Sequence, residues 1–417
     1  MNNYDVVIIG GGCAGIFLAS ELVDRGRSCA LLDKEPVASY ASTRNQGWLQ
    51  SGAFYAASGD VNAARGCKTG YEYITASYPE AIHQSVPSYY LFKAKDELET
   101  ALVSCGELGI PLRELGTGDL QSLVSENSLL EGAPFSYVAE TSDKPFDTNL
   151  LLRRVVGQAV RQGVDYYKVA EARSINPEPS GDGWHIAAER HRMQGKFLVL
   201  ACGPFIPEML HRFALDDAHD IKVTKTPVFV VQAKISNCAL IAPRTTRAPN
   251  IIPFGERRGI EGVSICLSRA DFDARDADDY EVDYLPSGAS VRDEFGKRIQ
   301  QFCPGIEQLV AAGEITGHIY ACQKIKPRSL EESRGAYIRF YDVEGCPLSV
   351  FYPGKFTSSP VSASQHAGQI ERTIPSYSPV TRGGSKRVPD VAEQRYYDPS
   401  QYKLKMRNGV LDLDPVF

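Results

Sequence analysis

A glycine-rich turn directly after a short apolar segment limits the folds open to this chain more than any other feature. Residues 4–9 (YDVVII) have the uninterrupted, β-branched character of a strand buried in a parallel sheet. The next six residues, 10–15 (GGGCAG), fit the pattern G-x-G-x-x-G. Residues 16–25 then carry apolar side chains at helical spacing, and residues 28–32 (SCALL) predict a second strand. The sequence therefore predicts a strand–turn–helix–strand unit.

Each glycine of this turn has a task in binding a dinucleotide. Gly10 permits the tight turn, Gly12 lets backbone N–H groups approach a pyrophosphate, and Gly15 lets the helix pack closely on the strand. The helix N-terminus adds partial positive charge beside the phosphates. Asp33, 18 residues after Gly15 at the end of the second strand, is placed to accept hydrogen bonds from ribose hydroxyls. The unit predicts a dinucleotide site and leaves FAD and NAD both open.

Two later regions repeat the alternation of helix and buried strand. Residues 147–162 have apolar side chains at helical spacing, and buried-strand patterns follow at 164–169 and 197–201. Near the end of the chain, residues 348–352 (LSVFY) predict a strand and residues 362–373 a helix. We therefore expect an α/β fold in which these segments complete a Rossmann-like domain.

The residues between these regions alternate as in an antiparallel sheet, as at 228–235 and 262–267. Because 417 residues is long for one core, we expect a second, α+β substrate domain built on a mainly antiparallel sheet and inserted in two pieces. The expected division is a cofactor domain of residues 1–84, 146–206 and 336–373, a substrate domain of residues 85–145 and 207–335, and a C-terminal extension of residues 374–417. We expect this extension either to wrap the body of the protein or to be partly ordered.

Charge and cysteine content argue against several classes of protein. The net charge is −6, whereas a broad nucleic-acid surface needs a basic face. No apolar run is long enough for a membrane span or begins like a secretory signal, so we expect a cytoplasmic protein without a transmembrane segment. The ten cysteines show neither C-x-x-C spacing nor a metal-ligand pattern with histidine, so we expect reduced thiols and no metal.

Four separated stretches resemble one family. The first is the glycine turn. The second, residues 42–55 (STRNQGWLQSGAFY), resembles the block S-x-R-N-S-G-V-I-H-A-G-I-Y-Y. The third, residues 200–204 (LACGP), is similar to a strand that ends in small residues and glycine. The fourth, residues 354–358 (GKFTS), is similar to the motif G-K-[LFW]-T. In this order the stretches resemble the D-amino-acid-oxidase superfamily of FAD-dependent oxidoreductases, nearest to the branch of L-2-hydroxyglutarate oxidases and glycerol-3-phosphate dehydrogenases.

The resemblance implies that the cofactor is FAD and that later segments hold the flavin ring. Backbone N–H groups at a helix start near residues 354–358 suit the electron-rich N1/O2 edge of reduced flavin. The alternative is an ordinary turn and cap, since Thr357 and Ser358 are good N-cap residues. The predicted cofactor-binding residues are Gly10, Gly12, Cys13, Ala14, Gly15, Asp33, Lys34, Thr43, Arg44, Asn45, Gln46, Gly47, Val169, Cys202, Gly203, Gly354, Lys355, Phe356, Thr357 and Ser358.

The same resemblance implies hydride transfer to flavin from a small amine, an amino acid or a 2-hydroxy acid. A base usually removes the hydroxyl proton of a hydroxy acid, but Gln50 stands where the family block has histidine, and glutamine is no base at neutral pH. An amine substrate needs no such base, so we weight it at least equally. The candidate catalytic residues are Gln50, His318, Tyr320 and Arg328, and the candidate arginines for a substrate carboxylate are Arg44, Arg257, Arg258 and Arg328.

Other interpretations remain open on the sequence. The electron acceptor is either O2 or a quinone, and the oligomeric state is undetermined. The alternative functions are a tailoring enzyme that acts on a bulkier substrate, a tRNA-modifying flavoprotein, and a flavin-bound protein that has lost its substrate site. The net negative charge of the chain argues against the tRNA-modifying flavoprotein. Cys322 lies late in the chain, where some amine oxidases of the superfamily attach flavin covalently, but its surroundings match them poorly.

Overall fold

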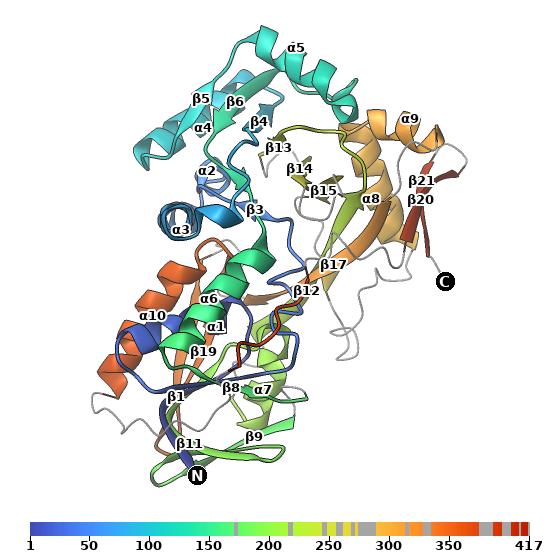
Figure 1. The fold of residues 1–417 in the computed structure, drawn as a ribbon. Helices are drawn as coiled ribbons and strands as arrows, with labels where there is room; N and C mark the ends of the chain where they lie inside the picture. The colour runs from blue at the N-terminus through green and yellow to red at the C-terminus, as the bar shows by residue number, and fades with distance from the viewer. Residues whose placement is uncertain are drawn as a thin grey trace.

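A computed structural model shows how the chain folds (Figure 1). The structure describes residues 1–170, 174–215, 220–243, 248–255, 262–267, 272–273, 289–312, 317–327, 335–374, 387–393, 402–407 and 410–415. Within these ranges two large sheets organise the molecule. In Figure 1 the first sheet and its helices form the lower part, and strands β12 (Ile221–Val231) and β17 (Gly317–Pro327) of the second sheet reach down toward it.

The first sheet has eight strands and is mostly parallel. Its main path is β18 (Tyr337–Val343), β19 (Cys346–Tyr352), β11 (His191–Leu200), β1 (Asn2–Ile9), β2 (Cys29–Asp33) and β8 (Asp165–Lys168), with β9 (Ile175–Ser180) and β10 (Gly183–Ala188) extending from β11. All five strands predicted for this part of the chain are present, with boundary shifts of a few residues. The longest shift is in β11, which begins at His191 because its first half pairs with β10.

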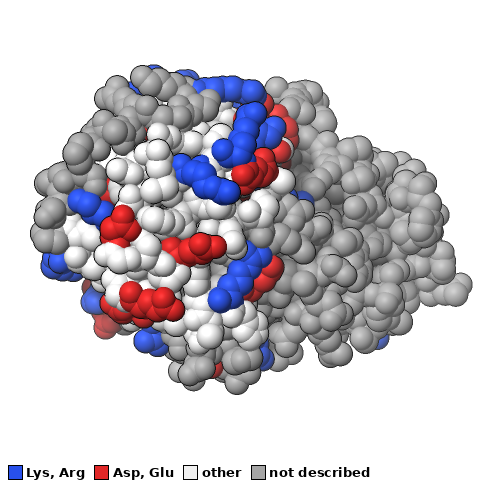
Figure 2. Space-filling model, turned by 90° about the horizontal axis from the view of Figure 1, so that it is seen from below, with Lys and Arg blue, Asp and Glu red and all other residues white. Residues whose placement is uncertain are grey.

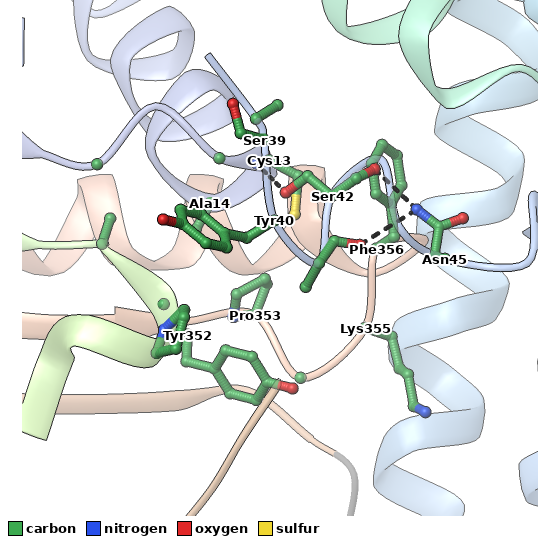
Figure 3. A pocket seen from close by; sticks show the side chains of 18 of the residues that line it. Cys13, Ala14, Ser39, Tyr40, Ser42, Asn45, Tyr352, Pro353, Lys355 and Phe356 are labelled. Atoms are coloured by element: carbon green, nitrogen blue, oxygen red, sulfur yellow. Dashed lines mark hydrogen bonds between the residues drawn. The ribbon is translucent and has the colours of Figure 1, made fainter. Parts of the chain in front are cut away.

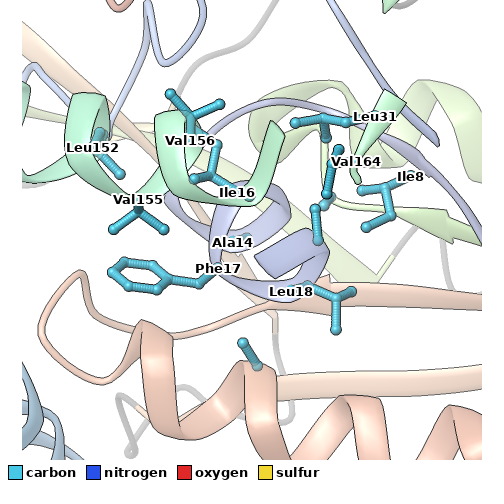
Figure 4. Packing of buried hydrophobic residues seen from close by; sticks show 14 of the residues in the cluster. Ile8, Ala14, Ile16, Phe17, Leu18, Leu31, Leu152, Val155, Val156 and Val164 are labelled. Carbon is cyan, nitrogen blue, oxygen red and sulfur yellow. The ribbon is translucent and has the colours of Figure 1, made fainter. Parts of the chain in front are cut away.

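Three helices cover one face of this sheet: α1 (Cys13–Asp24), α6 (Thr148–Gln162) and α10 (Ser359–Thr373). Figure 4 shows Ile16 and Phe17 of α1 near Val155 and Val156 of α6, while Leu18 points away from α6 within the same cluster. All five side chains are buried, and the removal of that apolar surface from water is the main force holding the helices on the sheet. The opposite face packs on a second apolar cluster that includes helix α7 (Ile206–Arg212).

The second sheet has nine strands and is mainly antiparallel, as expected. Its path is β16 (Phe272–Asp273), β12, β15 (Gly262–Leu267), β14 (Pro249–Phe254), β13 (Ala239–Ile241), β4 (Ser88–Phe92), β6 (Tyr137–Thr141) and β5 (Leu112–Glu114), with β17 on β12. The strand expected at 228–235 is wrong in its bounds, because the ladder with β17 begins at Ile221 and ends at Val231. Lysines and Pro227 hide the start of that strand in the sequence.

Helices surround the second sheet and join it to the first. They are α2 (Ala53–Ala56), α3 (Val61–Ser77), α4 (Lys95–Glu107), α5 (Thr117–Glu126), α8 (Ala289–Phe302) and α9 (Gly305–Ala311). Short 3-10 turns lie at Pro79–Ala81, Ser128–Leu130 and Gly203–Phe205, and a small two-stranded sheet pairs β3 (Trp48–Leu49) with β7 (Lys144–Pro145). No helix among the described residues has the length and apolarity that crossing a bilayer requires.

Residues 387–393, which we call the C-terminal strap, lie against the segment that follows β2. Val391 forms a parallel bridge with Val37, and the backbone N–H of Val37 donates to Asp390 O at 2.8 Å. Farther on, β20 (Tyr402–Arg407) and β21 (Val410–Pro415) form an antiparallel hairpin that contacts α8 and α9. Both described segments of the expected C-terminal extension thus lie against the body of the protein.

Charged side chains on the face drawn in Figure 2 are interspersed by sign. Among the described residues there, Lys and Arg side chains lie next to Asp and Glu rather than gathering into one field. Such a surface gives little long-range attraction for a polyanion.

Candidate cofactor and substrate site

One cavity of about 280 Å³ lies where the carboxyl ends of the parallel strands meet. Strands β19, β11, β1 and β2 are neighbours in the sheet, and each is followed by residues that line the cavity. Because adjacent strands are about 4.8 Å apart, four strand ends cover roughly 14 Å along the sheet edge. The edge of an open parallel sheet beyond its carboxyl ends is where ligands bind in this class of fold.

The glycine turn packs as its spacing predicts. A Cβ atom on Gly15 would lie 1.9 Å from Gly10 O, so helix α1 approaches β1 more closely than any other residue allows. Gly10 has φ of 113°, and a Cβ there would meet Ala201 O at 2.5 Å. Helix α1 begins at Cys13 after Gly12, with no side-chain cap from Gly12, and the Cys13 N–H donates to Ser42 Oγ at 2.9 Å. Ser42 therefore caps the first N–H of the helix, and Gly10 and Gly12 present backbone without a side chain to the cavity.

Asp33 lies at the end of β2 and lines the cavity beside this turn. Its carboxylate accepts the N–H of Gly11 at 2.7 Å and the N–H of Lys34 at 2.8 Å. Burial raises the pKa of Asp33 to about 6, although both hydrogen bonds favour its charged form. A carboxylate has about four acceptor positions, so capacity for hydroxyl donors remains.

Residues 38–46 form a compact loop that makes one wall of the cavity (Figure 3). The loop is folded on itself: Thr43 Oγ1 donates to Ala38 O at 2.6 Å and Asn45 Nδ2 donates to Ser42 O at 2.7 Å. Tyr40 packs edge-on against Phe205 at 5.3 Å between ring centres. These contacts place small and polar side chains of the loop opposite the start of α1.

Gln46 joins this loop to the second sheet. Its side-chain nitrogen donates to Asn250 O at 3.3 Å, and its backbone oxygen accepts from Ser264 Oγ at 3.1 Å. Asn250 and Ser264 belong to β14 and β15. The cavity is thereby bounded by both sheets.

Residues 353–358 form the far end of the cavity. Gly354 has φ of 76°, and Thr357 Oγ1 accepts the N–H of Gln50 at 3.2 Å. Ser358 is the N-cap residue of α10, but its hydroxyl donates to Pro353 O at 2.7 Å and makes no cap hydrogen bond. Ser358 therefore occupies the cap position without capping the helix through its hydroxyl, and Thr357 joins the loop to Gln50.

Helix α3 supports this loop from behind. A Cβ atom on Gly70 would lie 1.8 Å from Thr357 O, whereas one on Gly66 would lie 3.5 Å from Ser358 Cβ. Only a glycine at position 70 allows the loop to lie where it does. Gly70 was not predicted from the sequence, since nothing in the helix itself indicates a second segment packing on it.

A buried carboxylate, also missed from the sequence, anchors the neighbouring wall. Asp143 accepts hydrogen bonds from Trp48 Nε1 at 3.0 Å, from the N–H of Ser51 at 2.5 Å and from Tyr90 OH at 3.1 Å. It is fully buried, and this burial raises the pKa of its carboxyl. Asp143 therefore holds the run from Trp48 to Ser51 on the second sheet.

Most predicted cofactor residues meet at this cavity. Those that line it are Gly10, Gly12, Cys13, Ala14, Asp33, Lys34, Asn45, Gln46, Cys202, Gly203, Gly354, Lys355, Phe356 and Thr357. Those that lie outside its lining are Gly15, Thr43, Arg44, Gly47, Val169 and Ser358. The latter support the wall: Arg44 lies over the ring of Tyr40 at 5.4 Å, and the Val169 N–H donates to Asp33 O at 3.0 Å.

The candidate catalytic residues are spread more widely. Gln50 lines the cavity. His318 and Tyr320 are in β17, paired with Val230 and Val228 of β12, and the structure describes their backbone but not their side chains. Cys322 of β17 is likewise placed by its backbone pairing alone, and the arginines that fall outside the described residues are Arg257, Arg258 and Arg328.

Several lining residues were not singled out from the sequence. Thr226 and Val228 of β12 and Cys266 of β15 reach the cavity from the second sheet, and Tyr352 ends β19 beside them. The two-residue spacing of Thr226 and Val228 is typical of one strand face. That signal exists in the sequence, but it does not show which face meets a distant strand end.

The chemistry available in the lining is restricted. Among the lining residues that the structure describes, Asp33 carries the sole carboxylate and no histidine is present. The cations are Lys34, whose Nζ donates to Tyr40 OH at 2.8 Å beside the glycine turn, and Lys355 at the far end. The described residues hold no cluster of three or more His, Cys, Asp or Glu side chains arranged for a metal ion.

Known proteins share both the sequence pattern and the fold. A family model described as FAD dependent oxidoreductase (DAO) matches residues 5–340. One subunit of the anaerobic glycerol-3-phosphate dehydrogenase of Haemophilus influenzae is 44% identical over 63 residues, which is 15% of this chain and 11% of that protein. The match thus spans about a tenth of the relative's length.

Two crystal structures have a similar fold. Glycine oxidase from Geobacillus kaustophilus superposes with a TM-score of 0.68 at 16% identity, covering 92% of this chain and 100% of that one. The dithionite-reduced L-α-glycerophosphate oxidase from Mycoplasma pneumoniae with FAD bound has a TM-score of 0.67 at 14% identity, covering 94% and 99%. At these identities the likeness concerns the fold alone.

Proposed function

The chain belongs to the DAO family of FAD-dependent oxidoreductases, and we propose that it oxidises a small amine or amino acid, with a 2-hydroxy acid as the alternative, in the cavity between its two sheets. In this assignment residues 85–145 and 207–335 form the substrate domain. Bound FAD supplies the chemistry by accepting a hydride from the substrate. The observation that carries the proposal is one cavity bounded by the strand ends of the first sheet and by side chains of the second.

The residues along the strand ends fit FAD. Gly10 and Gly15 allow a close backbone approach that a Cβ atom would block, so the N-terminus of α1, with its partial positive charge, would face a pyrophosphate in the cavity. Asp33 offers acceptor positions to a ribose. The backbone of Gly354 to Thr357 would hold the ring at the other end of the edge.

The lining favours an amine over a hydroxy acid. Oxidation of a hydroxyl group needs a base for its proton, and near the second sheet the described lining offers Gln46, Gln50, Thr226 and Cys266 in place of a histidine or carboxylate. A neutral amine loses a hydride without that base. Lys355 would hold a carboxylate of the substrate by charge and hydrogen bonding.

Anaerobic titration of the FAD-loaded protein tests the proposal. Loss of the oxidised-flavin absorbance with amino acids or secondary amines, but not with 2-hydroxy acids of the same size, is the expected result. Reduction by 2-hydroxy acids alone would favour the alternative, and a protein that no member of either class reduces would contradict the proposal. Reoxidation by air or by a soluble quinone then distinguishes the two proposed electron acceptors.

A Lys355→Met variant tests the proposed carboxylate contact separately. Removing the cation leaves the aliphatic stem, so the loss should fall on substrate binding. We expect KM for an amino acid to rise by about tenfold or more, the effect of losing roughly 1.5–3 kcal/mol from a charged hydrogen bond. KM for the corresponding amine without a carboxylate should change little. An equal effect on both substrates would contradict the contact.

A further inference from the structure

Three hydrogen bonds hold the segment around Gln50. Its own N–H donates to Thr357 Oγ1 at 3.2 Å. The residues around it are bound to Asp143, which accepts from the Trp48 indole at 3.0 Å and from the Ser51 N–H at 2.5 Å. The backbone at Gln50 is therefore held on one side by the loop of residues 353–358 and on the other by the second sheet, through Asp143.

The carboxamide of Gln50 has one protein partner among the described residues. Cys67 Sγ lies 3.8 Å from Gln50 Oε1 and donates to it. Cys67 is fully buried in α3, and this burial raises the pKa of its thiol to about 12, so it remains an S–H donor at neutral pH. Because a thiol donor binds the amide oxygen and not the amide nitrogen, the oxygen of Gln50 faces Cys67. The amide nitrogen is then the atom that Gln50 presents to the cavity it lines.

We propose that Gln50 is a hydrogen-bond donor to an oxygen of the substrate, and that Cys67 is the positioning residue that selects this orientation of the amide. This inference rests on the proposed function and narrows the class of substrate that the cavity accepts. Lys355, which also lines the cavity, is likewise a donor without acceptor capacity. An amide donor and a cation in one cavity complement an oxyanion, so we expect the substrate to carry a carboxylate and a simple amine without one to bind poorly.

The probe is benzoate, titrated against the visible absorbance of the FAD-loaded protein, with benzamide as its neutral counterpart. Cys67→Ala removes the donor and lets the amide turn. We expect the benzoate dissociation constant to rise by about tenfold, the effect of one hydrogen bond to a charged group. Cys67→Ser keeps a donor and should restore most of the affinity. Benzamide binding and the dissociation constant of FAD should not follow this pattern.

Cys105→Ala is the matched control. Cys105 is a second fully buried thiol in the same apolar cluster, and it donates to the backbone oxygen of Ala53 at 3.9 Å, away from the cavity lining. Its removal should lower the melting temperature about as much as Cys67→Ala while leaving benzoate affinity unchanged. If Cys105→Ala and Cys67→Ala weaken benzoate equally, the effect is one of packing and the positioning role is overturned.

Gln50→Glu tests the donor role directly. The change is nearly isosteric, but it replaces the donor by a carboxylate that repels benzoate, so affinity should fall at neutral pH and recover as the pH is lowered and the carboxyl gains a proton. A pH-independent affinity equal to that of the parent protein, or no benzoate binding by the parent protein at all, would overturn the inference. Benzoate binding without reduction by any substrate would instead uphold the donor role and contradict the proposed function.

Discussion

The side-chain nitrogen of Asn149 donates to the backbone oxygen of Ala392 at 2.7 Å and to that of Val391 at 3.2 Å. The first residue is near the start of α6 and the others belong to the C-terminal strap. The strap also exchanges backbone hydrogen bonds with Val37, one residue before the loop that lines the cavity. The C-terminal strap therefore holds the segment that leads into the cavity wall in place.

Asn149→Ala should loosen this contact. Both hydrogen bonds are lost, and one buried and one partly buried backbone oxygen lose this partner, at a cost of about 1–3 kcal/mol in the free energy of unfolding. We also expect weaker retention of FAD, measured by flavin fluorescence after dilution. Arg153→Ala, which removes an exposed ion pair with Glu393 of the same strap, is the control and should cost at most about 1 kcal/mol. Equal effects of the two changes would argue against a role for Asn149 in holding the strap.

Gly15→Ala should abolish FAD binding. The added Cβ would lie 1.9 Å from Gly10 O, so α1 must move away from β1 and the turn must open. Flavin content after purification measures the effect, and urea unfolding should show a loss of about 1–3 kcal/mol from overpacking. Gly106→Ala in α4, where a Cβ has no neighbour within 4 Å, should leave flavin content unchanged. Normal flavin content in the Gly15→Ala variant would show that the close helix contact is dispensable.

Two glycines of α3 give a matched pair for the loop at the far end of the cavity. Gly70→Ala would bring a Cβ within 1.8 Å of Thr357 O, whereas Gly66→Ala would create an ordinary contact of 3.5 Å with Ser358. We expect the first to displace the loop and to lower the rate of flavin reduction by at least about tenfold. The second should have nearly normal kinetics and slightly higher helix stability. Similar kinetics for both variants would contradict a close packing of this loop on the helix.

His366 makes stability depend on pH. Its ring lies fully buried between Phe340 and Phe351, and its Nε2 is 2.9 Å from Ser349 Oγ. Burial lowers its pKa from 6.5 to about 3. Between these values the unfolded chain binds a proton that the folded one does not, so this group's stabilisation is present above pH 6.5 and is lost as the pH falls toward 3.

A His366→Gln variant keeps a polar group near Ser349 but does not titrate. Its free energy of unfolding should therefore decline less steeply than that of the parent protein between about pH 7 and pH 4. Urea unfolding across this range provides the measurement. Parallel curves for the two proteins would show that His366 is protonated in the folded state or accessible to water.

The cofactor half of the protein could be predicted well from the sequence alone, because its signals are local. A buried strand, a turn that needs glycine and an amphipathic helix are each encoded within a dozen residues, so residues 4–33 folded as expected. The loop at 354–358 was also located, since its residues resemble a family motif. The hydrogen bonds of its two hydroxyls were not foreseen, because Ser358 and Thr357 fit a helix cap equally well by sequence.

What only the tertiary structure decided is which distant segments meet. Asp143 is one acidic residue among many in the sequence, and it becomes an anchor because Trp48, Ser51 and Tyr90 converge on it. Cys67 likewise becomes meaningful through its contact with Gln50. Periodicity reports which face of a helix or strand is buried, but not against what it is buried. The sequence by itself determined the first strand, its glycine turn and the helix that packs closely on it, and the packing of two sheets determined which other segments line the cavity.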